Sequence, residues 1–350
     1  MSDRRVRFAV IGLDHAHIFG IIRGQLEAGS ELVGLASDDP QASVCQTVRR
    51  MFPDVAWFDD AAQLIDDPSI DLIATAAIPY RRGEIAIQAL QAGKHVLTDK
   101  PGCVSFEQLD AIRQAVASSG RFWVNVFSER FEVPAVARAG ELARSGAIGT
   151  VVQTLGLGPH REGDKAHLSG GAGRPEWFYR PQTYGGIIVD IASHQIDQFL
   201  WFTGSRSGEV VASTVGNFRH PEVPAFEDFG ELMLRSDHGQ GYIRVDWYTP
   251  DGLPTWGDGR LFVLGTEGYI EIRKYVDIAG REGTNHLFLV NQDGVQHLPC
   301  EHDPNPFHSQ IVADVLHNTR TAVPQEHTFE VLRLGLQAQA QAARRGNLPA

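Results

Sequence analysis

Short apolar segments alternate with segments of helical periodicity throughout the first third of the chain, and this alternation restricts the possible folds more than any other feature. The apolar segments, typical of strands buried on both faces, are residues 7–13, 31–37, 71–77, 94–98 and 122–127. The helical segments, each ending at a glycine, are residues 19–29, 79–93 and 105–120. A strand, helix, strand order predicts parallel strands with right-handed crossovers, so we expect an α/β doubly wound parallel sheet over residues 1–125.

After about residue 125 the apolar positions follow a period of two. The alternating segments, which predict antiparallel strands joined by turns, are residues 149–158, 208–218, 228–236, 239–249, 259–274 and 285–298. One helical segment, residues 185–204, lies among them, and the tail at residues 330–345 is also helical. We therefore expect residues 126–350 to form an α+β domain with a large open, mostly antiparallel sheet, onto whose body the C-terminal helix packs back.

Composition limits the partners and the compartment. A length of 350 residues with 43% hydrophobic residues is enough for two packed cores, and no segment is apolar over the length of a transmembrane helix. The 31 basic residues are outnumbered by 43 acidic ones, which argues against nucleic acid or an anionic membrane as a partner. The odd number of cysteines, 3, fits a reducing compartment better than a disulfide framework, so we expect a cytoplasmic protein.

The first predicted strand leads into the turn "GLDHAH", in the context where a GxGxxG motif holds a dinucleotide diphosphate at a helix N-terminus. Only Gly12 matches that Rossmann motif, because Asp14 and His17 occupy the second and third glycine positions. Asp14 either brings a negative charge to the phosphate position or caps the following helix. His15 and His17 form an H-x-H pair for which the sequence offers no identifiable third ligand. We therefore interpret them as a polar turn at a helix start, with a role facing cofactor or substrate from the crevice as the alternative, and we predict no metal site.

Two further positions lie beyond the carboxyl ends of predicted strands, where folds of this type bind their ligands. Lys100 closely follows the apolar segment 94–98, so its charge is expected to face that crevice. Ser37 and Asp38 follow the second strand. In dinucleotide-binding folds an acid at this position binds the adenosine ribose and favours NAD, whereas a small residue with a nearby arginine favours NADP. The alternative interpretation of Ser37 and Asp38 is a loop that begins a helix.

The helical segment 185–204 carries Asp190 and His194, which are four residues apart and therefore share one helix face, and Asp197 follows three residues later. A carboxylate beside an imidazole raises the imidazole pKa and can make it a base for a hydroxyl proton during hydride transfer. A surface ion pair is the alternative. The apolar neighbours of these residues predict a mostly buried helix. Burial of a polar pair there costs free energy unless the pair is hydrogen-bonded, which favours a specific role for it.

Together these motifs resemble the Gfo/Idh/MocA oxidoreductases, which include glucose-fructose oxidoreductase and inositol dehydrogenase. The resemblance covers nearly the whole chain and is carried by the degenerate turn, by "AGKHVLTDKP" at residues 92–101 and by "GGIIVDIASHQID" at residues 185–197. It implies catalytic roles for Lys100, which contacts the nicotinamide ribose and the reacting hydroxyl, for Asp190 in holding substrate, and for His194 as the acid/base. It also implies NAD or NADP as cofactor, with NAD slightly favoured. The implied cofactor-binding residues are Gly12, Asp14, His15, His17, Ser37, Asp38, Pro79, Lys100 and Pro101.

The chain departs from the family pattern before the lysine and in the loop after the apolar segment 71–77. Asp99 replaces the usual glutamate, and Arg82 stands, by our alignment, at the histidine of the family's T-P-N-x-x-H sequence. Arg82 could offset the charge of Asp14, contact an anionic substrate, or lie at a solvated helix start. The Gly-rich stretch 158–186 mixes aromatic and polar side chains suited to a polyol, although a flexible loop with incidental aromatics is the alternative. Its candidates for substrate contact are His160, Arg161, Trp177 and Tyr179.

The predicted function is the NAD(P)-dependent oxidation of a CH–OH group in a sugar, inositol or related polyhydroxy compound, in which His194 moves the proton and Lys100 places the hydroxyl. One alternative is an NAD-dependent glycosidase or lyase that oxidises its substrate transiently. The other is a non-catalytic sensor of a sugar or a dinucleotide. The resemblance further implies a homodimer or homotetramer assembled through the open sheet of the second domain.

Overall fold

The computed structural model describes residues 4–162 and 174–348, which divide into two compact units. The first unit comprises the chain up to residue 126 with residues 182–185 and 306–329, and the second comprises the remainder. The sequence predicted one boundary at 125/126 and no return of the chain to the first unit. Helix α11 (Phe307–His317) packs there on α1 (Ile18–Glu27), and Gln25 Nε2 lies 3.1 Å from His308 Nδ1.

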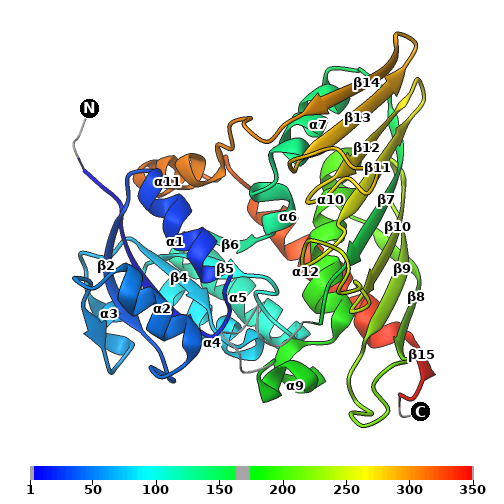
Figure 1. The fold of residues 1–350 in the computed structure, drawn as a ribbon. Coiled ribbons are helices and arrows are strands. Elements are labelled where there is room, and N and C mark those ends of the chain that lie inside the picture. Colours follow the sequence, from blue (N-terminus) through cyan, green and yellow to red (C-terminus); the bar gives the residue numbers. More distant parts are fainter. Residues whose placement is uncertain (1–3, 163–173, 349–350) are drawn as a thin grey trace. The chain divides into compact units, whose positions relative to one another are not determined.

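The first unit contains a six-stranded sheet with parallel pairings in the order β3-β2-β1-β4-β5-β6 (Figure 1). Its strands are β1 (Arg7–Leu13), β2 (Glu31–Ala36), β3 (Trp57–Phe58), β4 (Leu72–Ala76), β5 (His95–Asp99) and β6 (Trp123–Val126). The strand order changes direction at β1, which pairs with β2 on one side and β4 on the other. The predicted doubly wound sheet is thereby confirmed, and sheets of this type bind ligands at the change of direction.

Helices connect these strands: α1, α2 (Ser43–Met51), α3 (Ala62–Asp66), α4 (Pro79–Gln91) and α5 (Phe106–Ser119). The glycines expected at helix ends follow α1, α4 and α5, and each has a positive φ, the left-handed conformation common after a helix. The sequence patterns did not predict β3 or α3, and α2 appeared only as the helix in the alternative interpretation of Ser37 and Asp38. Their apolar patterns are too short to detect, since β3 has only 2 residues and α2 buries only Cys45 and Val48.

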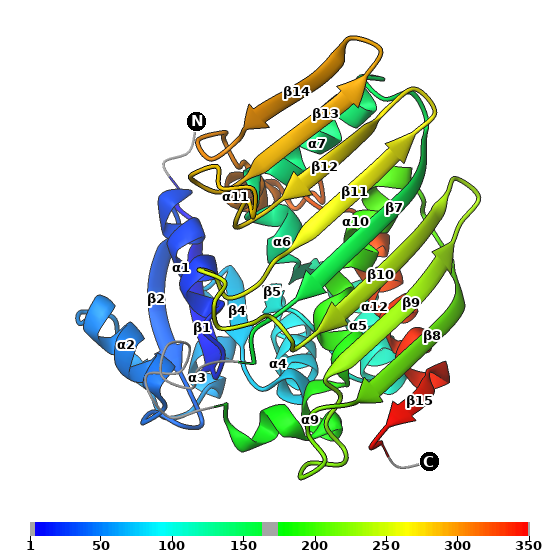
Figure 2. The ribbon, with the colours of Figure 1, turned by 45° about the vertical axis from the view of Figure 1, so that its right-hand side comes forward.

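The second unit is built on a nine-stranded sheet in the order β14-β13-β12-β11-β7-β10-β9-β8-β15 (Figure 2). Its strands are β7 (Val151–Pro159), β8 (Glu209–Asn217), β9 (Phe229–Arg235), β10 (Gln240–Asp246), β11 (Arg260–Gly265), β12 (Tyr269–Arg273), β13 (His286–Asn291), β14 (Gly294–Pro299) and β15 (Ala343–Gly346). Most pairings are antiparallel as predicted, but β7 runs parallel to β10 and β15 parallel to β8. The C-terminal tail is not helical throughout. Helix α12 (Gln325–Gln341) ends, and β15 then pairs with the edge strand β8, whose main-chain N–H and C=O groups would otherwise lack a neighbouring strand.

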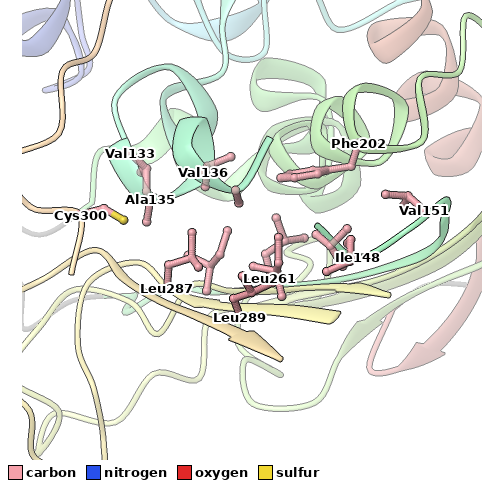
Figure 3. Packing of buried hydrophobic residues seen from close by; sticks show 14 residues of the cluster. Val133, Ala135, Val136, Ile148, Val151, Phe202, Leu261, Leu287, Leu289 and Cys300 are labelled. Atoms are coloured by element: carbon pink, nitrogen blue, oxygen red, sulfur yellow. The ribbon is translucent and has the colours of Figure 1, made fainter. Parts of the chain in front are cut away.

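Helices cover one face of this sheet. Helices α7 (Pro134–Arg144) and α10 (Ser193–Thr203) lie against the strands (Figure 2), and their apolar side chains meet those of the sheet in the core shown in Figure 3. Val136 of α7 and Phe202 of α10 belong to this core. The alternation along β9 leaves the other face open, because Leu232 and Leu234 are buried whereas Met233 is 46% exposed. None of the helices in residues 4–162 and 174–348 is both long and apolar enough to cross a membrane.

Candidate active site

Strand β5 places Lys100 at the carboxyl edge of the first sheet. All five residues of β5 are buried, because the strand lies between β4 and β6 and α4 packs against it. Lys100 follows directly, is only 5% exposed, and is joined to Pro101 by a cis peptide bond. Its main-chain N–H donates to Asp99 Oδ1 at 2.8 Å. A lysine is thereby fixed at the sheet edge where ligands of such folds bind.

Arg82 of α4 joins the turn after β5 to the end of β4. Its Nε donates to the Ala77 carbonyl at 2.6 Å, and its Nη1 donates to the carbonyls of Lys100 and Pro101, the latter at 3.2 Å. Its Nη2 lies 2.9 Å from Asp99 Oδ2, and the Arg82 side chain is 1% exposed. Arg82 therefore does not lie at a solvated helix start. We assign it to the support of this turn instead of to substrate contact, because its donors are engaged by protein oxygens.

Asp99 is the acceptor at the centre of this group. Its Oδ1 lies 2.8 Å from His17 Nδ1, and its Oδ2 lies 3.5 Å from His15 Nδ1. Burial alone would raise the pKa of Asp99, but the Arg82 guanidinium and the His17 imidazole outweigh burial and hold that pKa well below its usual range. Burial, reinforced by His17, holds the pKa of His15 well below its usual range. At neutral pH, Asp99 is therefore ionised and His15 is neutral.

The turn after β1 keeps one glycine for a steric reason. Gly12 has φ +78, and a Cβ there would lie 2.4 Å from Ala77 Cβ. The Asp14 Oδ2 accepts the main-chain N–H of Ile78 at 3.1 Å, whereas α1 begins without a side-chain cap. The proposed capping of the following helix by Asp14 was therefore wrong, because its carboxylate turns to the residue before α4. Burial raises the pKa of Asp14, and the hydrogen bond from the Ile78 N–H opposes this shift.

Ser37 and Asp38 follow β2, and Asp38 interacts with the first turn of α4. The Asp38 side chain is 85% exposed, and its Oδ2 lies 3.2 Å from Arg81 Nη2. Ser37 Oγ accepts the N–H of Asp39 at 3.3 Å. Pro79 begins α4. An exposed carboxylate at this strand end can accept a hydrogen bond from a ribose hydroxyl of NAD. Arg81 beside it is the residue type that binds the 2′-phosphate of NADP.

In the second unit, Asp190 and His194 lie where a π-helical turn, η2 (Ile188–Ala192), leads into α10. Hydrogen bonds of a π turn run from i to i+5, so the regular α-helical spacing that the sequence analysis assumed is interrupted here. His194 is 2% exposed, and Asp190 is partly buried. The N–H of Ile187 donates to the buried Glu227 Oε2 at 2.8 Å, which anchors the start of the turn. Such turns occur frequently at functional sites.

Buried ion pairs that sequence reasoning missed surround α10. Arg130 donates two hydrogen bonds of 2.6 Å to Asp197, so Asp197 belongs to an ion pair of the core. Buried Lys274 contacts Glu129 Oε2, to which Gln195 Nε2 also donates at 2.9 Å. The ion-pair partners lie 67 and 145 residues apart in the chain, so no local pattern could have revealed them.

Two of the substrate candidates, His160 and Arg161, follow β7. The His160 ring packs edge-on against Trp256, with the ring centres 4.6 Å apart. Arg161 Nη2 donates to the carbonyls of Pro250, at 3.1 Å, and Leu253, so its guanidinium holds a neighbouring loop. Residues 163–173 of the same stretch lie outside the described residues.

The other two candidates, Trp177 and Tyr179, lie on the short 3-10 helix η1 (Glu176–Tyr179). Tyr179 Oη donates to Glu162 Oε1 at 3.2 Å, and burial together with Glu162 raises the pKa of Tyr179 to about 12. Glu162 Oε2 also lies 2.8 Å from His220 Nε2, whose Nδ1 lies 3.0 Å from Asp228 Oδ2. No local sequence pattern could have revealed this polar chain, because Glu162 lies 17 residues from Tyr179 and 58 residues from His220.

Both halves of the chain match known protein families. The family described as "Oxidoreductase family, NAD-binding Rossmann fold" matches residues 6–127, and the "GFO/IDH/MocA C-terminal domain" matches residues 136–271. Among curated relatives, scyllo-inositol 2-dehydrogenase (NAD(+)) of Bacillus subtilis (strain 168) is 26% identical over 296 residues, which cover 81% of this chain and 79% of the relative.

Solved structures extend the similarity to nearly the full length. A crystal structure from Erwinia carotovora atroseptica SCRI1043, classed as an oxidoreductase, is 45% identical with a TM-score of 0.93 and covers 98% of this chain and 100% of its own. Levoglucosan dehydrogenase in complex with NADH and levoglucosan shares the fold with a TM-score of 0.76 at 18% identity, over 96% of this chain and 98% of its own. The first unit is thus an NAD-binding domain, and the chain belongs to the Gfo/Idh/MocA family of oxidoreductases.

Proposed function

We propose that the protein is an NAD(P)-dependent dehydrogenase that oxidises a CH–OH group of a sugar, an inositol or a related polyhydroxy compound. The observation that carries this proposal is the buried Lys100, held by the Arg82 guanidinium and the Asp99 carboxylate at the carboxyl edge of an NAD-binding sheet. Two relatives are named for reactions on scyllo-inositol and levoglucosan, and both of these compounds carry several hydroxyl groups.

The residues of the first unit fit a dinucleotide. Gly12 allows the tight turn after β1, and α1 begins at Ile18 with no side-chain cap, so the positive end of its dipole is available to a diphosphate. The Asp14 carboxylate accepts the main-chain N–H of Ile78, so it does not occupy the amides at the start of α1. The exposed Asp38 carboxylate slightly favours NAD over NADP.

In this proposal Lys100, His194 and Asp190 have separate chemical roles. Lys100 donates a hydrogen bond to the substrate hydroxyl, which orients the hydroxyl and favours loss of its proton. His194 accepts that proton, and its burial gives it a fixed orientation. Asp190 binds a neighbouring hydroxyl. The nicotinamide, when bound, supplies the hydride acceptor.

The test is a titration of the purified protein with NADH and NADPH, followed by energy transfer from tryptophan to the nicotinamide. Saturable binding and subsequent NADH formation on one member of a panel of polyols would support the dehydrogenase. Release of an aglycone without net NADH would replace it by the glycosidase. Binding without turnover on any polyol would favour the sensor, and no binding of either dinucleotide at millimolar concentration would refute the cofactor assignment.

We further propose that copies of the chain associate through the open face of the second sheet. Met233, Tyr242, Leu155 and Phe262 are successive cross-strand partners on β9, β10, β7 and β11, and none of these side chains is buried. A row of apolar side chains across an open sheet is typical of a protein interface. Sedimentation analysis should give a dimer or tetramer that Met233→Glu weakens. A monomeric wild type would refute this interface.

A further inference from the structure

Two imidazoles and a carboxylate converge at the carboxyl edge of the first sheet. His15 and His17 belong to the turn after β1, and Asp99 is the last residue of β5. One ligand atom from each residue lies within 4.8 Å of the other two. We propose that His15, His17 and Asp99 bind a borderline divalent metal ion such as Zn²⁺, whose remaining coordination position takes an anionic oxygen.

The spacing of the three side chains suits a tetrahedral ion. His17 Nδ1 lies 2.8 Å from Asp99 Oδ1, and His15 Nδ1 lies 3.5 Å from Asp99 Oδ2. Ligand atoms that are about 2.1 Å from a tetrahedral Zn²⁺ lie about 3.4 Å from one another. The two imidazole rings are centred 4.1 Å apart at 72°, so they do not stack, and both direct a nitrogen at the same carboxylate. Binding would lengthen the His17–Asp99 distance by about 0.6 Å and leave the His15–Asp99 distance nearly unchanged.

Contacts with Arg82 and with the main chain of Lys100 hold the Asp99 carboxylate in place. Arg82 Nη2 lies 2.9 Å from Asp99 Oδ2, and the Lys100 N–H donates to Asp99 Oδ1 at 2.8 Å. Asp99 is 1% exposed, so it cannot turn out to solvent. Outer partners of this kind orient the carboxylates of metal sites and contribute to affinity. The sequence pattern could not show this third ligand, because Asp99 lies 82 residues beyond His17.

The charge balance predicts what occupies the open position. The His15 and His17 side chains are 25% and 34% exposed, so an ion between them would be accessible from solvent. Arg82 already balances the charge of Asp99, and a divalent ion would add an excess of positive charge that an anionic oxygen would reduce. Folds of this type hold the dinucleotide diphosphate at this turn. We therefore expect a diphosphate oxygen to be the remaining ligand, a step that rests on the proposed cofactor binding.

The first experiment uses the full chain, stripped of metal with a chelator that is then removed. Titration with Zn²⁺ by calorimetry, and with Co²⁺ by visible absorption, should give one equivalent of bound ion and the spectrum of a tetrahedral nitrogen and oxygen site. His15→Ala and His17→Ala should each weaken binding by more than the roughly 10- to 100-fold that loss of an outer partner costs. Absence of stoichiometric binding to the wild-type protein would overturn the metal site.

A matched control separates this site from adventitious histidine binding. His297 is exposed in the second unit, and its Nε2 lies 3.2 Å from His286 Nδ1. His297→Ala should leave the bound equivalent unchanged. If His297→Ala removed the ion while His17→Ala did not, the proposed site would be refuted.

The dinucleotide is tested separately. NADH titrations of the stripped and the Zn²⁺-loaded protein should show tighter binding to the loaded form, and NAD⁺ should change the Co²⁺ spectrum. Metal binding with no effect on NADH affinity would refute the diphosphate ligand. NADH binding with no metal binding would refute the metal site and leave the dehydrogenase proposal intact.

Discussion

The Arg82 guanidinium and the Asp99 carboxylate form an ion pair in which Nη2 and Oδ2 are 2.9 Å apart and each side chain is 1% exposed. The same guanidinium donates to the carbonyls of Lys100 and Pro101. This pair therefore connects helix α4 with the turn that carries the proposed catalytic lysine. Because both charges are removed from water, loss of either partner leaves an unpaired buried ion.

Arg82→Met is accordingly expected to lower the free energy of unfolding by about 3–5 kcal/mol, the usual cost of breaking a buried pair from one side. Arg81→Gln is the matched control on the same helix, because Arg81 is 40% exposed and its partner Asp38 is 85% exposed. Its effect should stay below about 1 kcal/mol. Urea denaturation followed by circular dichroism measures both. Equal effects of the two substitutions would contradict the structural role of Arg82.

His194→Ala is expected to reduce kcat by about 10²- to 10⁴-fold, the range for loss of a general acid/base. The dissociation constant of NADH should hardly change, since His194 lies in the second unit and the dinucleotide binds the first. Steady-state kinetics combined with a fluorescence titration separate the two effects. Equal losses of turnover and cofactor affinity would show that His194 maintains the fold instead of moving the proton.

Asp38→Ala is expected to weaken NADH binding by about 10- to 100-fold, because a hydrogen bond to a charged group contributes about 1.5–3 kcal/mol. NADPH binding should improve relative to NADH, since the substitution removes a carboxylate and frees Arg81, now 3.2 Å from it, for a 2′-phosphate. The ratio of the two dissociation constants measures the change. An unchanged ratio would remove Asp38 from the ribose site.

Arg130→Met and Asp197→Asn should each destabilise the second unit by about 3–5 kcal/mol, because the pair is buried and joined by two hydrogen bonds of 2.6 Å. The double variant Arg130→Met with Asp197→Asn should lose less than the sum of the single variants, because it leaves no unpaired charge. Additive losses in a double-mutant cycle would show that the two side chains act independently.

Stability should fall as the pH decreases from about 6.5 to about 4, in part because of His308. Burial, with a contribution from Arg23, lowers the pKa of His308 from 6.5 to about 4 in the folded chain. Between these two pH values the imidazole is protonated in the unfolded chain but stays neutral in the folded chain, and this difference favours unfolding. The contribution of His308 to stability is therefore fully present above the unfolded pKa and is lost as the pH falls toward the folded pKa. His308→Gln should flatten the profile, whereas His302→Gln on the exposed surface should not. NMR titration of the His308 imidazole checks the shift directly.

The sequence predicted the parts of this protein that depend on local patterns. Apolar runs and helical periods placed β1, β2, β4, β5 and β6, and alternation placed the strands of the second sheet. The position of Lys100 at the edge of the first sheet followed from its place after β5. The short β3 and the strand β15 were missed, because a few residues carry too little periodicity to distinguish a strand from a loop or a helix end.

Only the tertiary structure decided which distant side chains meet. Periodicity fixes how a segment buries its apolar face, whereas hydrogen bonds and ion pairs depend on distances that exist only after the segments have packed. His17 and Asp99 meet across 82 residues of chain, and the parallel pairing of β7 with β10 could not be read from the alternation of either strand. The sequence by itself therefore determined the family, the NAD-binding sheet and the position of Lys100. The folded chain decided that Asp99 is the common partner of His15, His17 and Arg82.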